Sequence, residues 1–171
     1  MITRRLSTAA AIAVLSAVAL VSSCSASDEV TASTVAPSLA GEAPPPPNLD
    51  NGRVARGEEL YQQNCASCHR ADLSGDPNWK TPNPDGSYPP PPHDSSGHTW
   101  HHSDQLLLEI IGDGSDFPES RMPTFSGALT DEEILAIIEY FKANWGQEQR
   151  GFQWQVTWQQ AERDPRVLLG R

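Results

Sequence analysis

Cys65, Cys68 and His69 lie in a C-x-x-C-H run, the arrangement in this chain with the clearest chemistry. Two thiols separated by two residues can add across the two vinyl groups of one porphyrin, and the adjacent His can then ligate the iron. The run therefore predicts one covalently attached haem c, bound through Cys65 and Cys68 and ligated by His69.

A C-x-x-C pair also occurs in redox dithiols, zinc sites and disulfides. A zinc site needs further ligands at short spacing, and no cysteine follows Cys68. A thioredoxin-like dithiol needs a βαβ context, whereas the flanking segments have helical and proline-rich patterns. These patterns favour haem over the three alternatives.

The third cysteine, Cys24, follows a leader that carries Arg4 and Arg5 and then an apolar stretch over residues 9–21. This layout is typical of a secretory signal. Residues 20–24 resemble a bacterial lipobox, in which the cysteine is acylated and becomes the first residue of the mature protein. No cysteine is then left without an expected role.

We therefore expect a lipoprotein signal peptide over residues 1–23 and lipid attachment at Cys24. The mature protein would be exported and attached to the membrane by its N-terminal lipid, at the outer face of the cytoplasmic membrane or in the periplasm. Two alternatives stay open, an ordinary signal peptide cut near Ala26 and an uncleaved membrane anchor. The apolar run is short for a membrane span of about 20 residues.

The composition is acidic, with a formal net charge of −10. Removal of residues 1–23 takes away two arginines and no acids, which leaves 10 basic and 22 acidic side chains and a charge near −12. Such a surface argues against nucleic acid as a partner and favours redox proteins with a basic docking surface. The alternative is that the acidity only keeps an exported protein soluble.

Composition also divides the chain. Residues 24–50 are rich in Ser, Ala, Thr and Pro, and such a segment buries too little apolar surface to fold, so it is predicted to be a tether. One domain is predicted over residues 51–146, followed by a C-terminal extension over 147–171.

Three segments of this domain have the apolar spacing of helices. The first runs from Asn51 to the haem site, the second starts after Ser103, and the third starts after Thr130, where Glu133 completes a capping box. Gly57 inside the first helix costs about 1 kcal/mol against Ala, which indicates a close approach by another element. No segment alternates as a strand does, so the fold is predicted to be all-α with long loops.

Over residues 51–146 the chain resembles a class I bacterial cytochrome c. The matching features are Gly57 to Tyr61, the C-x-x-C-H run, Met122 with Pro123 and Phe125, and a final helix with Ile137 and Tyr140. The resemblance implies three main helices and long loops wrapped around a covalent haem, with Gly57 and Tyr61 against Ile137 and Tyr140. It also implies that a carbonyl near Pro92 accepts the Nδ1 proton of His69, and that the Trp100 indole donates to a haem propionate or simply packs.

Met122 is the predicted sixth ligand of the iron. It is the only methionine after Met1 and lies in an M-P-x-F sequence before the last predicted helix, where the resembling family presents its ligand. A Met that merely fills a gap in the core is one alternative. Ligation by a histidine, or a second metal site, is another, and the candidates are His93, His98, His101 and His102.

These features predict one-electron transfer by a membrane-tethered monohaem cytochrome with His/Met-ligated iron, not an enzyme and without a small-molecule substrate. A cytochrome c subunit of a larger oxidoreductase, such as a dehydrogenase or terminal oxidase, is a second hypothesis. A five-coordinate haem sensor is a third, and reaction of the reduced protein with carbon monoxide distinguishes it.

Overall fold

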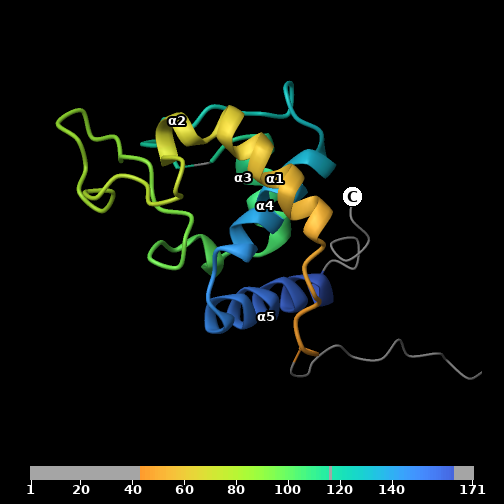
Figure 1. Ribbon diagram of the computed structural model, residues 1–171. Helices are drawn as coiled ribbons and strands as arrows, with labels where there is room; N and C mark the ends of the chain where they lie inside the picture. Colours follow the sequence, from red (N-terminus) through yellow and green to blue (C-terminus); the bar gives the residue numbers. More distant parts are fainter. Residues whose placement is uncertain (1–42, 116, 164–171) are drawn as a thin grey trace, which may run out of the picture. The chain divides into compact units, whose positions relative to one another are not determined.

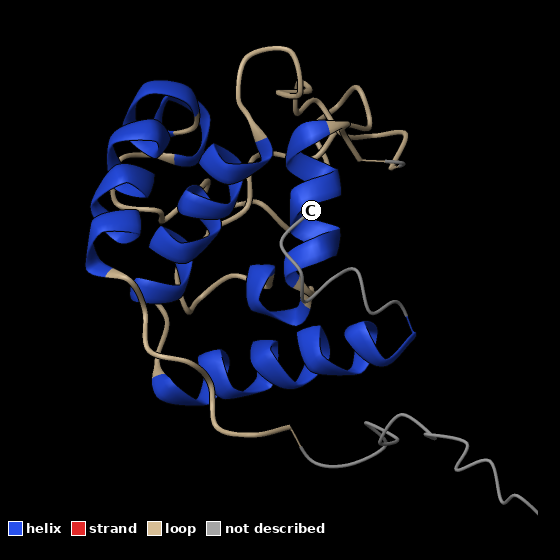
Figure 2. Cartoon of the chain, turned by 90° about the vertical axis from the view of Figure 1, so that its right-hand side faces the viewer, coloured by secondary structure: helices blue, strands red, loops and turns tan. Residues whose placement is uncertain are grey.

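The computed structural model describes residues 43–115 and 117–163 (Figure 1). This part of the chain contains helices and loops and no strand (Figure 2), which confirms the predicted all-α fold. No helix within it is long and apolar enough to cross a membrane. The predicted signal peptide over residues 1–23 and the lipid site at Cys24 lie outside the described residues.

The first helix, α1, spans Asn51–Asn64 and begins where the sequence predicts it. Asp50 caps it, because its carboxylate accepts a hydrogen bond from the backbone N–H of Arg53 at 2.8 Å. The buried side of α1 carries Gly57, Leu60 and Tyr61. One face of the helix is thus available to pack against another helix.

That partner is α4, which spans Asp131–Ala143. The capping box of Thr130 and Glu133 is formed as predicted, and three acidic residues in the first turn suit the positive end of the helix dipole. Its buried residues are Ile134, Ala136, Ile137, Ile138, Tyr140 and Phe141. These side chains form much of the hydrophobic core.

The two helices cross at Gly57, as the glycine predicts. A Cβ atom at this position would lie 1.9 Å from the carbonyl oxygen of Ala136 and 3.0 Å from Cβ of Tyr140. Next to this contact the rings of Tyr61 and Tyr140 lie 5.5 Å apart, centroid to centroid. The expected packing of Gly57 and Tyr61 against Tyr140 is thereby confirmed.

Gly57→Ala should therefore lower the free energy of unfolding, although Ala favours a helix over Gly by about 1 kcal/mol. The obstacle is backbone, so the helices must separate, and we expect a net loss of about 2 kcal/mol. Denaturant unfolding of the haem-loaded protein measures it. The matched control is Gly151→Ala, a helical glycine with no atom within 4 Å of the added Cβ. Equal stability of the two variants would contradict the close crossing.

The haem-attachment sequence forms a short helix, α2, over Ala66–His69, directly after α1. A long loop then leads to the one-turn helix η1, Thr99–His101. This loop turns back on itself at once: Arg70, Leu73 and Gly75 all have positive φ angles. Such conformations are costly for side chains other than Gly, so surrounding contacts must hold them.

Helix α3 spans Asp104–Gly112 and is capped by Ser103, as predicted. The loop that carries Met122 is attached to the end of this helix. The backbone N–H of Phe125 donates to the carbonyl of Gly112 at 2.9 Å, and so does that of Ser126. Because the last carbonyls of a helix lack partners within it, these bonds fix the loop to α3.

The predicted C-terminal extension contains a further helix, α5, over Gln147–Arg163. Its buried positions are Gln153, Thr157 and Ala161, which recur every four residues. Gln153 donates to the Asp104 carboxylate at 2.6 Å, and the hydroxyl of Thr157 accepts from the backbone N–H of Asp104 at 3.1 Å. The helix thus packs on the start of α3 through polar groups.

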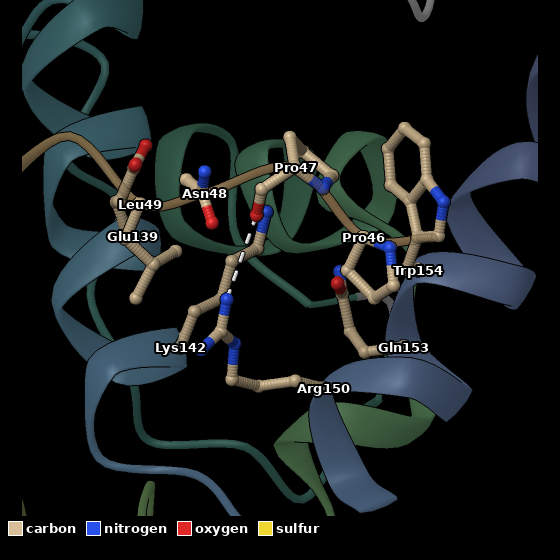
Figure 3. A pocket seen from close by; sticks show the side chains of 9 residues that line it. All are labelled: Pro46, Pro47, Asn48, Leu49, Glu139, Lys142, Arg150, Gln153 and Trp154. Atoms are coloured by element: carbon tan, nitrogen blue, oxygen red, sulfur yellow. Dashed lines mark hydrogen bonds between the residues drawn. The ribbon is translucent and has the colours of Figure 1, made fainter. Parts of the chain in front are cut away.

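On another side, α5 binds the described end of the predicted tether. The indole N–H of Trp154 donates to the carbonyl of Pro44 at 2.6 Å, and the backbone N–H of Ala43 donates to Gln155 at 3.0 Å. Arg150 reaches the carbonyl of Pro47 beside a small pocket (Figure 3). The extended proline segment therefore follows α5 before it enters α1.

Candidate haem-binding site

Cys65 and Cys68 are both free thiols. Cys65 is the N-cap of α2, and Cys68 lies within this helix. Cys65 is buried in the hydrophobic core, whereas Cys68 is exposed. Burial, with a smaller contribution from nearby Cys68, raises the pKa of the Cys65 thiol to about 11. Redox dithiols depend on a lowered thiol pKa, so this environment argues against that alternative.

His69 ends α2 and is buried, with 7% of its surface exposed. Its Nδ1 lies 2.9 Å from the carbonyl oxygen of Pro91. A carbonyl only accepts, so Nδ1 carries the ring proton and Nε2 keeps a lone pair for a metal. Burial lowers the pKa of His69, partly offset by this hydrogen bond, so the ring is neutral as ligation requires.

The proline run made the choice of carbonyl uncertain from the sequence, and the structure selects Pro91 rather than Pro92. Gly75 explains how Pro91 is held. It has a φ of +61°, and a Cβ atom there would lie 2.5 Å from the carbonyl carbon of Pro91. Its own N–H donates to the carbonyl of His69 at 3.0 Å. Sequence analysis missed Gly75, whose signal is a glycine six residues after the ligand in a tight loop.

Tyr61 fixes the chain on the other side of His69. Its side chain is fully buried, and its hydroxyl lies 2.7 Å from the carbonyl of Arg70 and 3.2 Å from that of His69. Burial raises the pKa of Tyr61, so the hydroxyl keeps its proton and donates it. This bond helps to hold Arg70 in its costly conformation with a positive φ of 65°.

Met122 is partly buried and packs against the same hydrophobic cluster that contains Cys65. Its backbone N–H donates to the hydroxyl of Ser120 at 3.3 Å. The adjacent Arg121 pairs with Asp85 of the long loop at 3.0 Å. The loop with Met122 is thus attached both to α3 and to the loop that follows α2.

The four histidines do not form one cluster. His93 contacts His69, whereas His98 stacks on Trp79 and approaches His102, with centroid distances of 5.1 and 5.4 Å. His101 packs on Trp100 at 3.9 Å. In the described part of the chain, no three His, Cys, Asp or Glu side chains are grouped so that they could hold a metal ion. The structure therefore gives no support to a second metal site.

Trp100 does not offer a free donor. Its indole N–H donates to the carbonyl of Gly97 at 3.0 Å, and its ring lies 5.5 Å from that of Phe152 in α5. These contacts support packing, one of the two roles that the resemblance left open for Trp100.

The donor set fits haem c. Two free thiols lie at the required spacing beside a neutral imidazole whose Nε2 is available, and a thioether packs on the same core as one thiol. Cys65, Cys68 and His69 would hold the group, and the thioether of Met122 would be a soft sixth ligand.

Comparison with known families agrees with this chemistry. The family described as Cytochrome c matches residues 54–145, which is more than half of the chain and includes all four of these side chains. No solved structure matches the chain. Membership implies haem c binding and haem-based electron transfer. The chain belongs to the cytochrome c family.

Proposed function

We propose that this chain is a one-electron carrier of class I type with a single haem. Cys65 and Cys68 attach the haem, and His69 and Met122 are the axial ligands. When bound, the haem supplies a reversible change between Fe(II) and Fe(III). The observation that carries the proposal is the hydrogen bond from His69 to Pro91 beside two free thiols.

The chain itself positions the residues that would ligate the iron. The bond to Pro91 fixes the tautomer of His69, and Gly75 keeps that carbonyl in place. The attached loop presents Met122 from the end of α3. The single C-x-x-C-H run supports one haem. With both axial positions filled, no site is left for a substrate on the iron.

A redox titration and a gas-binding test examine this proposal in the same sample. We expect a one-electron titration curve and no change in the spectrum of the reduced protein under carbon monoxide, because Met122 fills the sixth position. Binding of carbon monoxide to the wild type at neutral pH would instead favour the five-coordinate sensor. Copurification of a stable catalytic partner from native membranes would favour the oxidoreductase subunit.

The acidic surface supports redox partners with a basic docking surface. A cationic oxidant, tris(phenanthroline)cobalt(III), should oxidise the reduced protein more slowly as salt rises, because the Debye length shrinks from about 10 Å at 0.1 M to about 3 Å at 1 M. The anion ferricyanide is the matched control and should react faster with salt. The same salt dependence for both reagents would remove the electrostatic argument.

The leader supports export and a lipid anchor at Cys24. Cys24→Ala should abolish acylation while the spectrum of the haem stays unchanged. One acyl chain binds a membrane marginally and several bind it firmly, so the wild type should stay with membranes after a high-salt wash. Fractionation with mass spectrometry of the N-terminus measures both. A wild-type protein free of lipid at Cys24 would contradict the anchor.

A further inference from the structure

The ring of His93 packs directly on the proposed proximal ligand. Its centroid lies 4.1 Å from that of His69, with an angle of 31° between the ring planes. The ring of Phe141, from α4, lies 4.4 Å from the ring of His93 at an angle of 20°. The ring of Tyr61 lies 6.4 Å from that of His93, in an edge-on arrangement. His93 therefore lies in contact with both the helical core and His69.

The backbone of His93 is fixed at both of its polar groups. Its N–H donates to the carbonyl of Leu73 at 2.8 Å, and its carbonyl accepts from the indole N–H of Trp145 at 2.8 Å. The preceding carbonyl, of Pro92, lies where a Cβ on Gly97 would be only 2.1 Å away. Movement of His93 would thus require several contacts to break together.

The side chain is fixed as well. Thr99 is buried, and its hydroxyl lies 3.3 Å from the carbonyl of Pro92 and 2.9 Å from Nδ1 of His93. The hydroxyl thus bonds Nδ1 of His93 and restrains its ring. Burial, with smaller contributions from His69 and His98, lowers the pKa of His93 well below its usual value, so the ring is neutral.

His69 by itself has less restraint. The ring turns about its Cβ–Cγ bond, and the bond to Pro91 restrains that rotation at one atom on the edge of the ring, Nδ1. The His93 ring, with its centroid at 4.1 Å, adds a steric restraint on the same rotation. Sequence alone presents His93 as a rival ligand, whereas its contacts indicate a supporting role.

We propose that His93 is a positioning residue: its ring fixes the plane of the His69 imidazole about the bond that His69 makes to the iron. This inference rests on ligation by His69. The plane of an axial imidazole determines its overlap with the iron d orbitals and hence the g values of low-spin ferric haem. Substitution of residues that orient a metal ligand typically lowers metal affinity or activity by about 10- to 100-fold.

The test uses the haem-loaded protein and three variants. His93→Phe keeps a flat ring, His93→Leu keeps apolar bulk without one, and Thr99→Val removes the hydroxyl that bonds the ring of His93. His101→Leu is the matched control, since His101 packs on Trp100 rather than on His69. Low-temperature electron paramagnetic resonance gives the g values, and a redox titration gives the midpoint potential.

We expect His93→Leu to shift the g values and the midpoint potential, and Thr99→Val to broaden the ferric signal. His93→Phe and His101→Leu should remain close to the wild type. Unchanged g values in His93→Leu would overturn the proposal, and so would equal shifts in the Phe and Leu variants. If His93→Leu does not fold, an unbroadened signal in Thr99→Val has the same force. A wild type without a low-spin ferric signal would instead refute the ligation of the iron.

Discussion

Met122→Ala is expected to open the sixth coordination position, so that carbon monoxide binds the reduced haem and the ferric spectrum becomes partly high-spin. The wild type should do neither. The Ala side chain has no donor atom, and the loop of Met122 is held in place by its bonds to α3 and to the long loop. Electron exchange should slow as well, because loss and return of a weak ligand would then accompany each transfer.

Met122→His should keep a six-coordinate, low-spin haem but lower its midpoint potential. A thioether is a neutral soft donor that favours Fe(II), whereas an imidazole is a stronger donor that favours Fe(III) relative to it. We expect a fall on the order of 0.2 V, within the range of about 0.8 V that axial ligands span. Optical redox titration measures it.

The matched control is Thr124→Ala, an exposed position two residues along the same loop. It should leave both the spectrum and the potential unchanged. Pro123 and Phe125 should matter through the shape of the loop and not as ligands. An unchanged ferric spectrum and potential in Met122→Ala would mean that the sixth ligand is elsewhere, and His101 and His102 would be the next residues to substitute.

Replacement of the two cysteines should abolish covalent attachment of haem. Expressed with haem-maturation machinery, the wild type should retain its haem through acid and organic-solvent extraction, since thioether bonds do not dissociate. The double variant Cys65→Ala with Cys68→Ala should lose all of it. Ala is preferred to Ser at position 65, because a hydroxyl buried there without a partner would cost about 1–3 kcal/mol.

The single variants should retain haem through one bond and show a shifted reduced spectrum, because one vinyl group stays unsaturated. Ser67→Ala, between the two cysteines, is the control and should behave like the wild type. Mass spectrometry of the extracted chain gives the mass of the attached group. Free extraction of haem from the wild type would eliminate the proposed attachment.

The sequence by itself determined the elements whose signals are local. Each N-cap lies next to the helix that it starts, so Ser103 and the Thr130–Glu133 box could be recognised before any tertiary contact was known. Gly57 also gave a local signal. A glycine inside a helix is costly, so it indicates that another element comes too close for a Cβ atom to fit. The C-x-x-C-H run predicted its chemistry because its spacing is set by the cofactor.

Helix α5 was not predicted, because two of its three buried positions are polar. Gln153 and Thr157 occupy positions where hydrophobic periodicity would require apolar side chains. Their burial is favourable only because Asp104 and its neighbours supply hydrogen-bond partners from a distant segment. The docking of the proline segment on Trp154 depends on the same helix and was therefore not predicted either.

Only the tertiary structure showed which residues hold the proposed ligand His69 in place. In a run of consecutive prolines, the choice of Pro91 as acceptor depends on where Gly75 folds the loop back, and no local pattern encodes that register. The packing of His93 against His69 likewise joins residues 24 positions apart, and contacts with α4 and Trp145 hold His93 there. Residue type specified the ligands, whereas their orientation required long-range packing, because it depends on contacts between segments that meet only in the folded chain.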